Sequence, residues 1–236
     1  MNRVAVIGAS GAIGSAFVEY YSRQADTHTV YALSRQQKNF SSPLVETVHL
    51  DLTEESSIAE AAARITSDLE IVILASGLLH DDEIMPEKSL RQLTQDHLQK
   101  VFQVNTIGPA LVMKYFLPLL PTDRKCVFAA LSARVGSISD NRLGGWYSYR
   151  ASKAALNMLL KTAAVETGRR NRHARIIGLH PGTVDSALSA PFQQRVPSGK
   201  LFSPAFAAEQ MAQVIATVPA DASGKCFAYD SSEVPA

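Results

Sequence analysis

The chain of 236 residues is long enough for one α/β domain with a sizeable core. Its formal net charge is +1 and no basic stripe is present, which argues against nucleic acid as the main partner. Cys126 and Cys226 are far apart and lack ligand-spaced neighbours, so no metal site is expected. Neither a run of 18 or more apolar residues nor a leader pattern is found, which predicts a cytoplasmic protein without membrane contact.

The first 24 residues are typical of a dinucleotide-binding turn. The apolar run 3–7 predicts a buried strand, and an amphipathic helix follows a glycine-rich turn. Gly8 permits the tight turn, and Gly14 lets the helix pack closely on the strand, so backbone amides at the helix N-terminus can approach a pyrophosphate. A merely structural turn is the alternative. The predicted cofactor-binding residues here are Gly8, Ser10, Gly11, Ala12, Ile13 and Gly14.

The end of the second strand, predicted over residues 28–33, bears on the choice of cofactor. An acidic residue there would hydrogen-bond the adenosine 2′-hydroxyl and repel a 2′-phosphate. This chain has Ser34 and Arg35, a donor pair suited to a phosphate dianion. We therefore expect NADP(H) to be preferred over NAD(H), the alternative being a solvated arginine at a strand end.

Two further strands are predicted over residues 45–50 and 70–74. Thr53 is a candidate cap for a helix over residues 54–66. Asp51 could be a plain strand-end carboxylate or accept from an adenine amino group. Small residues after the fourth strand would leave space for a cofactor across the strand ends. The predicted contacts of these two segments are Asp51, Leu52, Ala75, Ser76 and Gly77.

A polar loop is expected over residues 81–93, with Thr94 capping a long helix to about residue 117. Gly108-Pro109 interrupts this helix, so a kink is predicted there. Asn105 falls on the apolar stripe of the helix. A buried amide must be hydrogen-bonded, so Asn105 is either a satisfied core residue or part of a site.

The second half of the chain carries the candidate chemistry. A strand over residues 125–131 ends at Ser132, and a helix over 149–168 begins with Tyr149 and Lys153, four residues apart and therefore on one face. An ammonium beside a phenol favours the phenolate, which would make the tyrosine a usable acid or base near neutral pH. A surface tyrosine over a lysine stem is the alternative.

After a strand over residues 175–179, the chain reaches Pro181, Gly182 and Val184. Residues 187–200 read as a mobile substrate loop, followed by a helix over 204–218 and a strand over 225–229. Strands alternating with helices predict a single Rossmann-type α/β domain over residues 1–236, with a doubly wound parallel sheet flanked by helices. In such sheets, ligands bind at the carboxyl ends of the strands.

Over nearly its whole length the sequence resembles the short-chain dehydrogenase/reductase family. Within the family it looks like the branch of C-factor signalling proteins and sniffer-type carbonyl reductases, on the sequences of residues 134–138 and 149–157. The residues that carry the resemblance are Gly8, Gly14, Asp51, Asn105, Ser132, Tyr149, Lys153, Pro181 and Gly182.

The resemblance implies a role for each of four catalytic residues. Tyr149 would be the general acid in carbonyl reduction and the base in the reverse direction. Lys153 would hold the nicotinamide ribose and lower the pKa of the tyrosine. Asn105 would fix a water in a proton relay to Lys153, and Ser132 would hydrogen-bond the substrate carbonyl oxygen.

Three departures from the family pattern stand out. The middle glycine of the turn is displaced, with Ala12 in its place, and the usual Asn-Asn-Ala-Gly after the fourth strand is absent. The family serine lies three residues before a glycine, a position held here by Ala133. Its neighbour Ser132 is the favoured carbonyl donor, and Ser137 is the rival.

Two functions are therefore carried forward. The first is an NADP(H)-dependent oxidoreductase acting on a small to medium carbonyl or alcohol. The second is a nucleotide-sensing or signalling protein on the same fold with little turnover, since fold alone does not establish catalysis. Apolar residues on more than one face of the 149–168 helix predict a homodimer or homotetramer, unless that helix is buried within its own domain.

Overall fold

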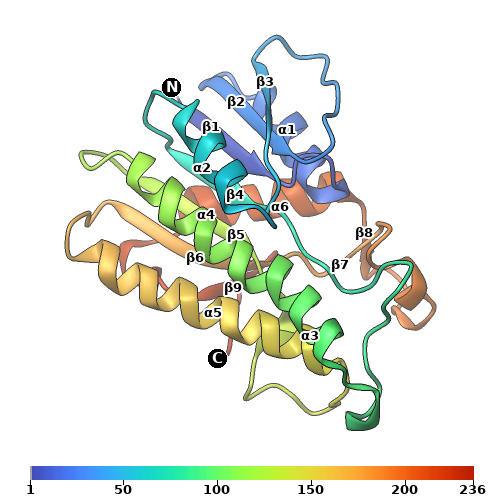
Figure 1. The fold of residues 1–236 in the computed structure, drawn as a ribbon. Helices are drawn as coiled ribbons and strands as arrows, with labels where there is room; N and C mark the ends of the chain where they lie inside the picture. The colour runs from blue at the N-terminus through green and yellow to red at the C-terminus, as the bar shows by residue number, and fades with distance from the viewer. Residues whose placement is uncertain (1) are drawn as a thin grey trace.

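The computed structural model describes residues 2–236 and has an eight-stranded sheet at its centre (Figure 1). The strand order is β10-β9-β6-β5-β4-β1-β2-β3, and every pair is parallel except β9–β10. The strands of this sheet are β1 (Asn2–Ile7), β2 (Thr27–Ser34), β3 (Val45–His49), β4 (Ile71–Leu74), β5 (Cys126–Leu131), β6 (Ala174–His180), β9 (Cys226–Ala228) and β10 (Glu233–Val234). A separate pair joins β7 (Thr183–Val184) to β8 (Leu201–Phe202).

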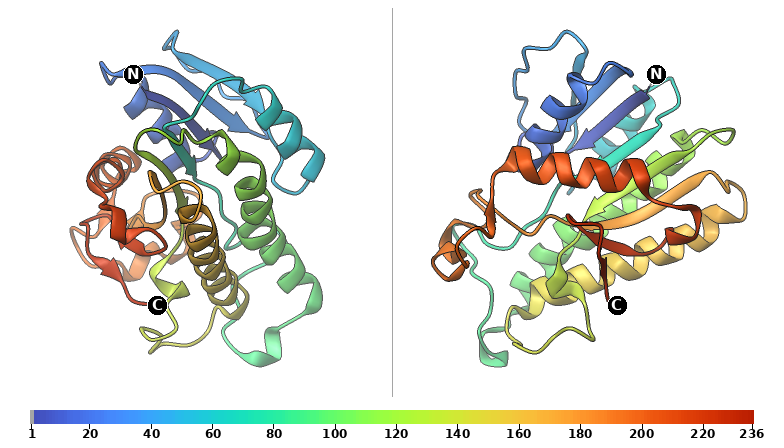
Figure 2. Two further views of the ribbon diagram at one scale, coloured as in Figure 1. Left: turned by 90° about the vertical axis from the view of Figure 1, so that its left-hand side faces the viewer. Right: turned by 180° about the vertical axis from the view of Figure 1, so that it is seen from behind.

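Helices cover both faces of the sheet (Figure 2). They are α1 (Ala12–Ser22), α2 (Glu55–Ala63), α3 (Gln95–Phe102), α4 (Gly108–Phe116), α5 (Tyr147–Gly168) and α6 (Pro204–Thr217). One apolar core lies between the sheet and α2, α4 and α5, and another between the sheet and α1 and α6. Short 3-10 turns are η1 (Leu90–Gln92), η3 (Leu117–Leu119), η4 (Arg134–Gly136), η5 (Ala190–Arg195) and η6 (Ala220–Ala222).

The apolar, β-branched runs form the central strands because both faces of each are covered, as the fully buried β5 shows. Every parallel strand predicted from the sequence is present, with ends that differ by one or two residues. The predicted parallel, doubly wound sheet is confirmed, with one addition at its edge. The antiparallel β10 and the β7–β8 pair were missed because strands of two residues leave no measurable periodicity.

The reversal of strand order places the cofactor-type crevice. From β1 the chain builds outward through β2 and β3, then returns to place β4 on the other side of β1. The residues after β1 and β4 therefore diverge at neighbouring strand ends, where ligands bind in open α/β sheets. The backbone amide of Ala75 donates to the Ile7 carbonyl oxygen over 2.7 Å, so these two ends are held together.

The helix predicted over residues 94–117 is broken in a different way from the one expected. Thr94 caps α3, as predicted, by accepting from the His97 amide over 3.2 Å. The irregularity is a π turn, η2 (Gln103–Ile107), which ends immediately before Gly108-Pro109, where the kink was expected. Pro109 has no amide to bond the carbonyl four residues earlier, so the turn widens on its N-terminal side.

One predicted cap is wrong. Thr53 does not cap α2, whose N-cap is Glu54 with no side-chain hydrogen bond. The amide and hydroxyl of Thr53 instead both donate to Asp51 Oδ1, at 2.9 and 2.7 Å. Thr53 could either accept from an amide of the helix or donate to the nearby Asp51 carboxylate. It donates to the carboxylate, and this holds it in a turn before the helix.

Candidate active site

Two glycines shape the turn between β1 and α1. Gly8 has φ of +88°, and a Cβ at this residue would lie 2.8 Å from the Ala75 carbonyl oxygen. A Cβ at Gly14 would overlap the carbonyl oxygen of Gly8. Gly11, the N-cap of α1, supplies no side-chain cap, so the first amides of the helix are available to an anion. These features fit a dinucleotide pyrophosphate.

A cleft of about 550 Å³ opens at this turn and runs across the ends of β1, β2 and β4. The predicted cofactor-binding residues that line it are Gly8, Ser10, Gly11, Ser34, Arg35, Asp51, Leu52, Ala75, Ser76 and Gly77. The predicted residues outside its lining are Ala12, Ile13, Gly14, Lys153, Pro181, Gly182 and Val184. Gly14 lies behind the turn rather than on it, because its role is close contact with Gly8.

An arginine brings positive charge to the part of the cleft at the end of β2. Arg35 is exposed there, whereas the Ser34 hydroxyl donates to the Gln36 carbonyl oxygen over 2.7 Å. Burial alone would raise the pKa of Asp51, but the Thr53 hydrogen bonds and the Arg35 charge together hold that pKa below its ordinary value. The cleft therefore has an exposed guanidinium at the end of β2 and an ionised carboxylate after β3.

Tyr149 and Lys153 lie on the inward face of α5, as their spacing predicted. Lys153 is 2% exposed and its Nζ donates to the Leu131 carbonyl oxygen over 2.8 Å. The same Nζ lies 5.8 Å from the centroid of the Tyr149 ring, which is 9% exposed. A Cβ built on Gly77 would lie 3.4 Å from Nζ, so this ammonium also borders the cleft.

Burial shifts both pKa values toward the neutral forms. It raises the pKa of Tyr149 to about 12 and lowers that of Lys153 to about 8, although the Cys226 thiol, if ionised, would act in the opposite direction on the lysine. In the chain by itself, burial decides the pKa of Tyr149 and acts in the direction opposite to the one expected from Lys153, whose effect on the tyrosine stays a prediction. Loss of hydration disfavours the phenolate, and the ammonium is turned toward the Leu131 carbonyl.

Asn105 is fully buried in the π turn and is satisfied on both sides of its amide. Its Oδ1 accepts from the Leu78 amide over 2.7 Å, and its Nδ2 donates to the Leu78 carbonyl oxygen over 2.8 Å and to Ser152 Oγ over 3.1 Å. Ser152 Oγ in turn donates to the Tyr149 carbonyl oxygen. Asn105 thus connects the wall of the cleft to the helix that carries Tyr149.

Neither candidate serine is a free carbonyl donor in the chain by itself. Ser132, directly after β5, donates its hydroxyl to Asn157 Oδ1 over 2.6 Å. Ser137 is 2% exposed, and its hydroxyl donates to the Ala236 carbonyl oxygen over 3.4 Å. Ser132 follows the residue whose carbonyl receives Lys153, whereas Ser137 lies beyond η4. The position favours Ser132, with Ala133 where the family serine stands.

A series of aromatic rings leads from Tyr149 to the predicted substrate loop. The Trp146 ring meets the Tyr149 ring edge-on at 6.2 Å between centroids, and the Phe192 ring lies 4.9 Å beyond Trp146. His80 packs against Phe192 at 5.7 Å, and its Nε2 bonds the Leu188 carbonyl oxygen over 3.1 Å. Part of the predicted substrate loop, residues 187–200, therefore rests on the tyrosine side of the fold through these rings.

The segment after β6 is held by close contacts of its own rather than by the cleft. Gly182 has φ of +73°, and a Cβ there would lie 2.7 Å from the Phe202 ring. Val184 is 4% exposed and belongs to β7, which pairs with β8 at the two ends of the substrate loop. The pair fixes where that loop leaves and rejoins the domain.

Three groups of this site were not predicted from the sequence, although the spacing of one of them would have allowed it. Asn157 is four residues beyond Lys153, so the same helical face could have identified it. Trp146 is the chain's one tryptophan and stands three residues before Tyr149. The Leu131 carbonyl could not have been found, because a backbone acceptor has no sequence signature.

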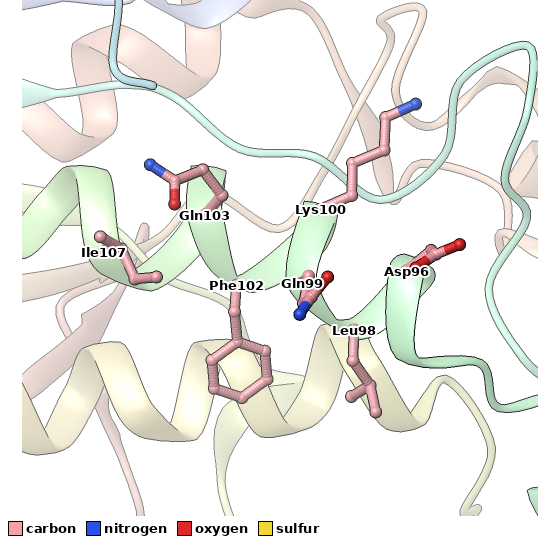
Figure 3. Close-up of a pocket in the computed structure, with 7 residues that line it drawn as sticks. All are labelled: Asp96, Leu98, Gln99, Lys100, Phe102, Gln103 and Ile107. Atoms are coloured by element: carbon pink, nitrogen blue, oxygen red, sulfur yellow. The ribbon is translucent and has the colours of Figure 1, made fainter. Parts of the chain in front are cut away.

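A larger hollow of about 860 Å³ lies away from the tyrosine, on the outer side of α3 and the π turn (Figure 3). Leu98 and Phe102 point toward α5 in this view, and Ile107 is 45% exposed. On α5, Met158 and Val165 are 66% and 50% exposed. Because these apolar side chains lack cover within the domain, the homodimer or homotetramer stays a prediction that the arrangement allows.

Within residues 2–236, no helix has the length and apolar character needed to cross a bilayer. The same part of the chain holds no group of three or more His, Cys, Asp and Glu side chains placed to bind a metal ion.

Comparison with known proteins agrees with this geometry. A family model described as short chain dehydrogenase matches residues 2–196. An uncharacterized oxidoreductase of Schizosaccharomyces pombe is 28% identical over 251 aligned positions, covering 98% of this chain and 96% of that protein. The C-signal of Myxococcus xanthus is 33% identical over 138 positions, 58% of this chain and 78% of that protein.

Solved structures share the fold at lower identity. NADPH-bound carbonyl reductase from chicken fatty liver is 24% identical, with a TM-score of 0.87 over 100% of this chain and 99% of that one. Carbonyl reductase Sniffer of D. melanogaster is 21% identical, with a TM-score of 0.85 over 100% of both chains. The chain belongs to the short-chain dehydrogenase family, as predicted; the C-signal protein is among its relatives, and the two carbonyl reductases share its fold. Membership makes it an oxidoreductase of the nicotinamide-dependent kind.

Proposed function

We propose that this oxidoreductase uses NADP(H) to interconvert a small to medium, fairly apolar carbonyl compound and its alcohol. The observation that supports this most is that a residue lining the cleft lies close to the two side chains proposed for the chemistry. Gly77 lines the cleft, Lys153 Nζ lies 3.4 Å from the Cβ position of Gly77, and the same Nζ is 5.8 Å from the Tyr149 ring centroid. A cofactor across the strand ends and a substrate at the phenol would then meet at this ammonium.

The roles follow from where the groups lie. A bound nicotinamide would supply or accept the hydride. Tyr149, with its raised pKa, keeps its proton at neutral pH and is therefore suited to protonate a developing alkoxide. Lys153, ionised below about pH 8, would stabilise the phenolate left behind and bind a ribose hydroxyl. Asn105 and Ser132 would orient the relay and the carbonyl oxygen.

The test is turnover. Purified protein should oxidise NADPH in the presence of at least one member of a panel of aldehydes, aromatic and aliphatic ketones, and quinones. Activity should depend on substrate concentration and reverse with the corresponding alcohol and NADP. NADPH binding detected by calorimetry, together with no turnover on the whole panel, would contradict the catalytic part of this proposal.

The preference for the 2′-phosphate is proposed to depend on Arg35. Its guanidinium is exposed at the end of β2, and no described carboxylate occupies that strand end. Replacing Arg35 with alanine should weaken NADPH binding by about 10- to 100-fold, since hydrogen bonds to charged groups contribute ~1.5–3 kcal/mol. NADH binding should change less than twofold. An equal loss of affinity for NADPH and NADH would show that Arg35 does not bind the 2′-phosphate.

A second function has one specific observation in its favour. Ala133 stands at the family serine position and Ser132 donates to Asn157, so the donor for a substrate carbonyl is committed elsewhere. A chain that binds the nucleotide and signals through its bound state would need no such donor. Saturable NADPH binding without turnover on the panel would favour this function.

A further inference from the structure

The helix that carries Tyr149 begins without a cap of its own. Residues 144–146 all have positive φ, and Trp146, the N-cap of α5, has φ of 53° and no side-chain hydrogen bond to the helix. No acidic residue lies in the first turn. Tyr149 is the third helical residue, so its position depends directly on how this turn is fixed.

A carboxylate far away in the sequence supplies the missing cap. Glu87 is 2% exposed, and its Oε2 accepts from the Ser148 amide over 3.2 Å. Its Oε1 accepts from the Ser148 hydroxyl, and its backbone carbonyl accepts from the Trp146 amide over 2.5 Å. Three bonds from one residue therefore hold Trp146 and Ser148, on either side of the first residue of α5, and the negative charge faces the positive end of that helix.

The same carboxylate reaches the helix that leads to Asn105. Its Oε1 lies 3.4 Å from His97 Nδ1, and His97 is in the first turn of α3, where it is 7% exposed. Glu87 thus lies between the starts of two helices. One carries Tyr149 and Lys153, and the other continues through the π turn that contains Asn105.

These side chains resemble a hydrolytic triad but are connected in a different order. The Ser148 hydroxyl donates to Glu87, with no bond to the imidazole, and Ser148 is fully buried. An activated serine nucleophile needs its hydroxyl bonded to the base and open to substrate. The cluster is therefore built to hold helices, and its chemistry is that of a cap.

We propose that Glu87 is a positioning residue for the reaction at Tyr149. By holding the Ser148 amide and hydroxyl, it fixes the first turn of α5 and thereby the direction of the phenol. The proposal rests on the proposed reductase function where turnover is the measurement, but the first turn of α5 can also be observed directly. A misplacement of about 1 Å at a reacting group can lower a rate by on the order of 100-fold.

The decisive variant is Glu87→Ala. We expect kcat to fall by about 10- to 100-fold while the dissociation constant for NADPH stays within about twofold, because Glu87 does not line the cleft. Amide exchange at residues 147–149 should accelerate by at least about tenfold, since the first turn would lose its cap. Glu87→Gln keeps an acceptor oxygen and should restore kcat to within about fivefold of the original chain.

Glu70 offers a matched control. It is also a buried glutamate, 6% exposed, that accepts a backbone amide, from Arg3 over 2.7 Å, and pairs with a cation, Arg124, over 2.7 Å. It lies immediately before β4, at the opposite end of the sheet from the cleft. Glu70→Ala should lower the Tm comparably to Glu87→Ala but leave kcat and exchange at residues 147–149 unchanged.

Each result decides the matter. Equal kcat in the two alanine variants, or unchanged exchange at residues 147–149 in Glu87→Ala, would overturn the positioning role. If the original chain shows no turnover, the proposed function fails, and the exchange measurement alone decides whether Glu87 fixes this turn. If Glu87→Ala does not fold, Ser148→Ala takes its place, with kcat expected to fall by about fivefold and an unchanged kcat refuting the proposal.

Discussion

Replacing Tyr149 with phenylalanine should lower kcat/KM for carbonyl reduction by about 1,000-fold, within the range of general acid catalysis. Among the described residues, none is hydrogen-bonded to the Tyr149 hydroxyl, and the ring packs edge-on against Trp146. Removing the hydroxyl therefore deletes the proposed proton donor and leaves the packing intact. The Tm and the dissociation constant for NADPH should stay at their original values, so the loss would be confined to the chemical step.

A second tyrosine in the same turn provides the control. Tyr147 lies two residues earlier in α5 and is partly exposed, and its hydroxyl has no part in the site described above. Tyr147→Phe should retain kcat/KM within about twofold, since surface substitutions seldom perturb structure. Steady-state kinetics on any substrate found in the panel gives both values. Reduction that proceeds at the original rate in Tyr149→Phe would remove the phenol from the mechanism and require another acid.

The second large effect is expected at the glycine turn. A Cβ at Gly14 would overlap the Gly8 carbonyl oxygen, and both groups are backbone at their contact, so no side-chain rotation relieves it. Gly14→Ala should lower the free energy of unfolding by about 3 kcal/mol, as overpacking of rigid neighbours does. For a chain of this size that corresponds to a Tm lower by roughly 10 °C. NADPH binding should weaken by at least about tenfold, because Gly8 would be displaced.

Alanine substitutions at two other glycines are the controls, because they show what alanine does where no such overlap exists. A Cβ at Gly11 would lie 3.4 Å from the same carbonyl oxygen, an ordinary contact, and nothing lies within 4 Å of one at Gly168. Thermal unfolding of Gly168→Ala should match or slightly exceed the original Tm, since alanine restricts the unfolded chain. A Gly14→Ala protein as stable as Gly168→Ala would mean that α1 moves freely away from β1.

The sequence predicted the frame of the cleft well because that frame is made by local patterns. A strand, small residues and an amphipathic helix occur in that order, and the structure has β1, Gly8 to Gly14, and α1 in the same order. The spacing of Tyr149 and Lys153 likewise placed both on the inward face of α5. Such features depend only on residues close in the sequence.

What could not be predicted depends on burial and on distant contacts. The direction of the Tyr149 pKa shift reversed because the number of groups covering the phenol cannot be counted from the sequence. Glu87 stands in a stretch predicted to be a polar loop, 61 residues before Ser148, whose amide it caps. Ser132 was chosen for its position in a motif, while its bond to Asn157 depends on how α5 packs on β5.

The π turn has a bearing on how relatives of this chain are aligned. It adds about one residue to a helix that would otherwise be regular, so that α3 and α4 differ in rotational phase by about 100° from an uninterrupted helix. A homologue with a one-residue gap within 103–107 would have a continuous helix and a different side chain facing Leu78. Such a gap would therefore mark a lineage in which the amide link between cleft and tyrosine helix has been lost, even where the Tyr-x-x-x-Lys pair remains.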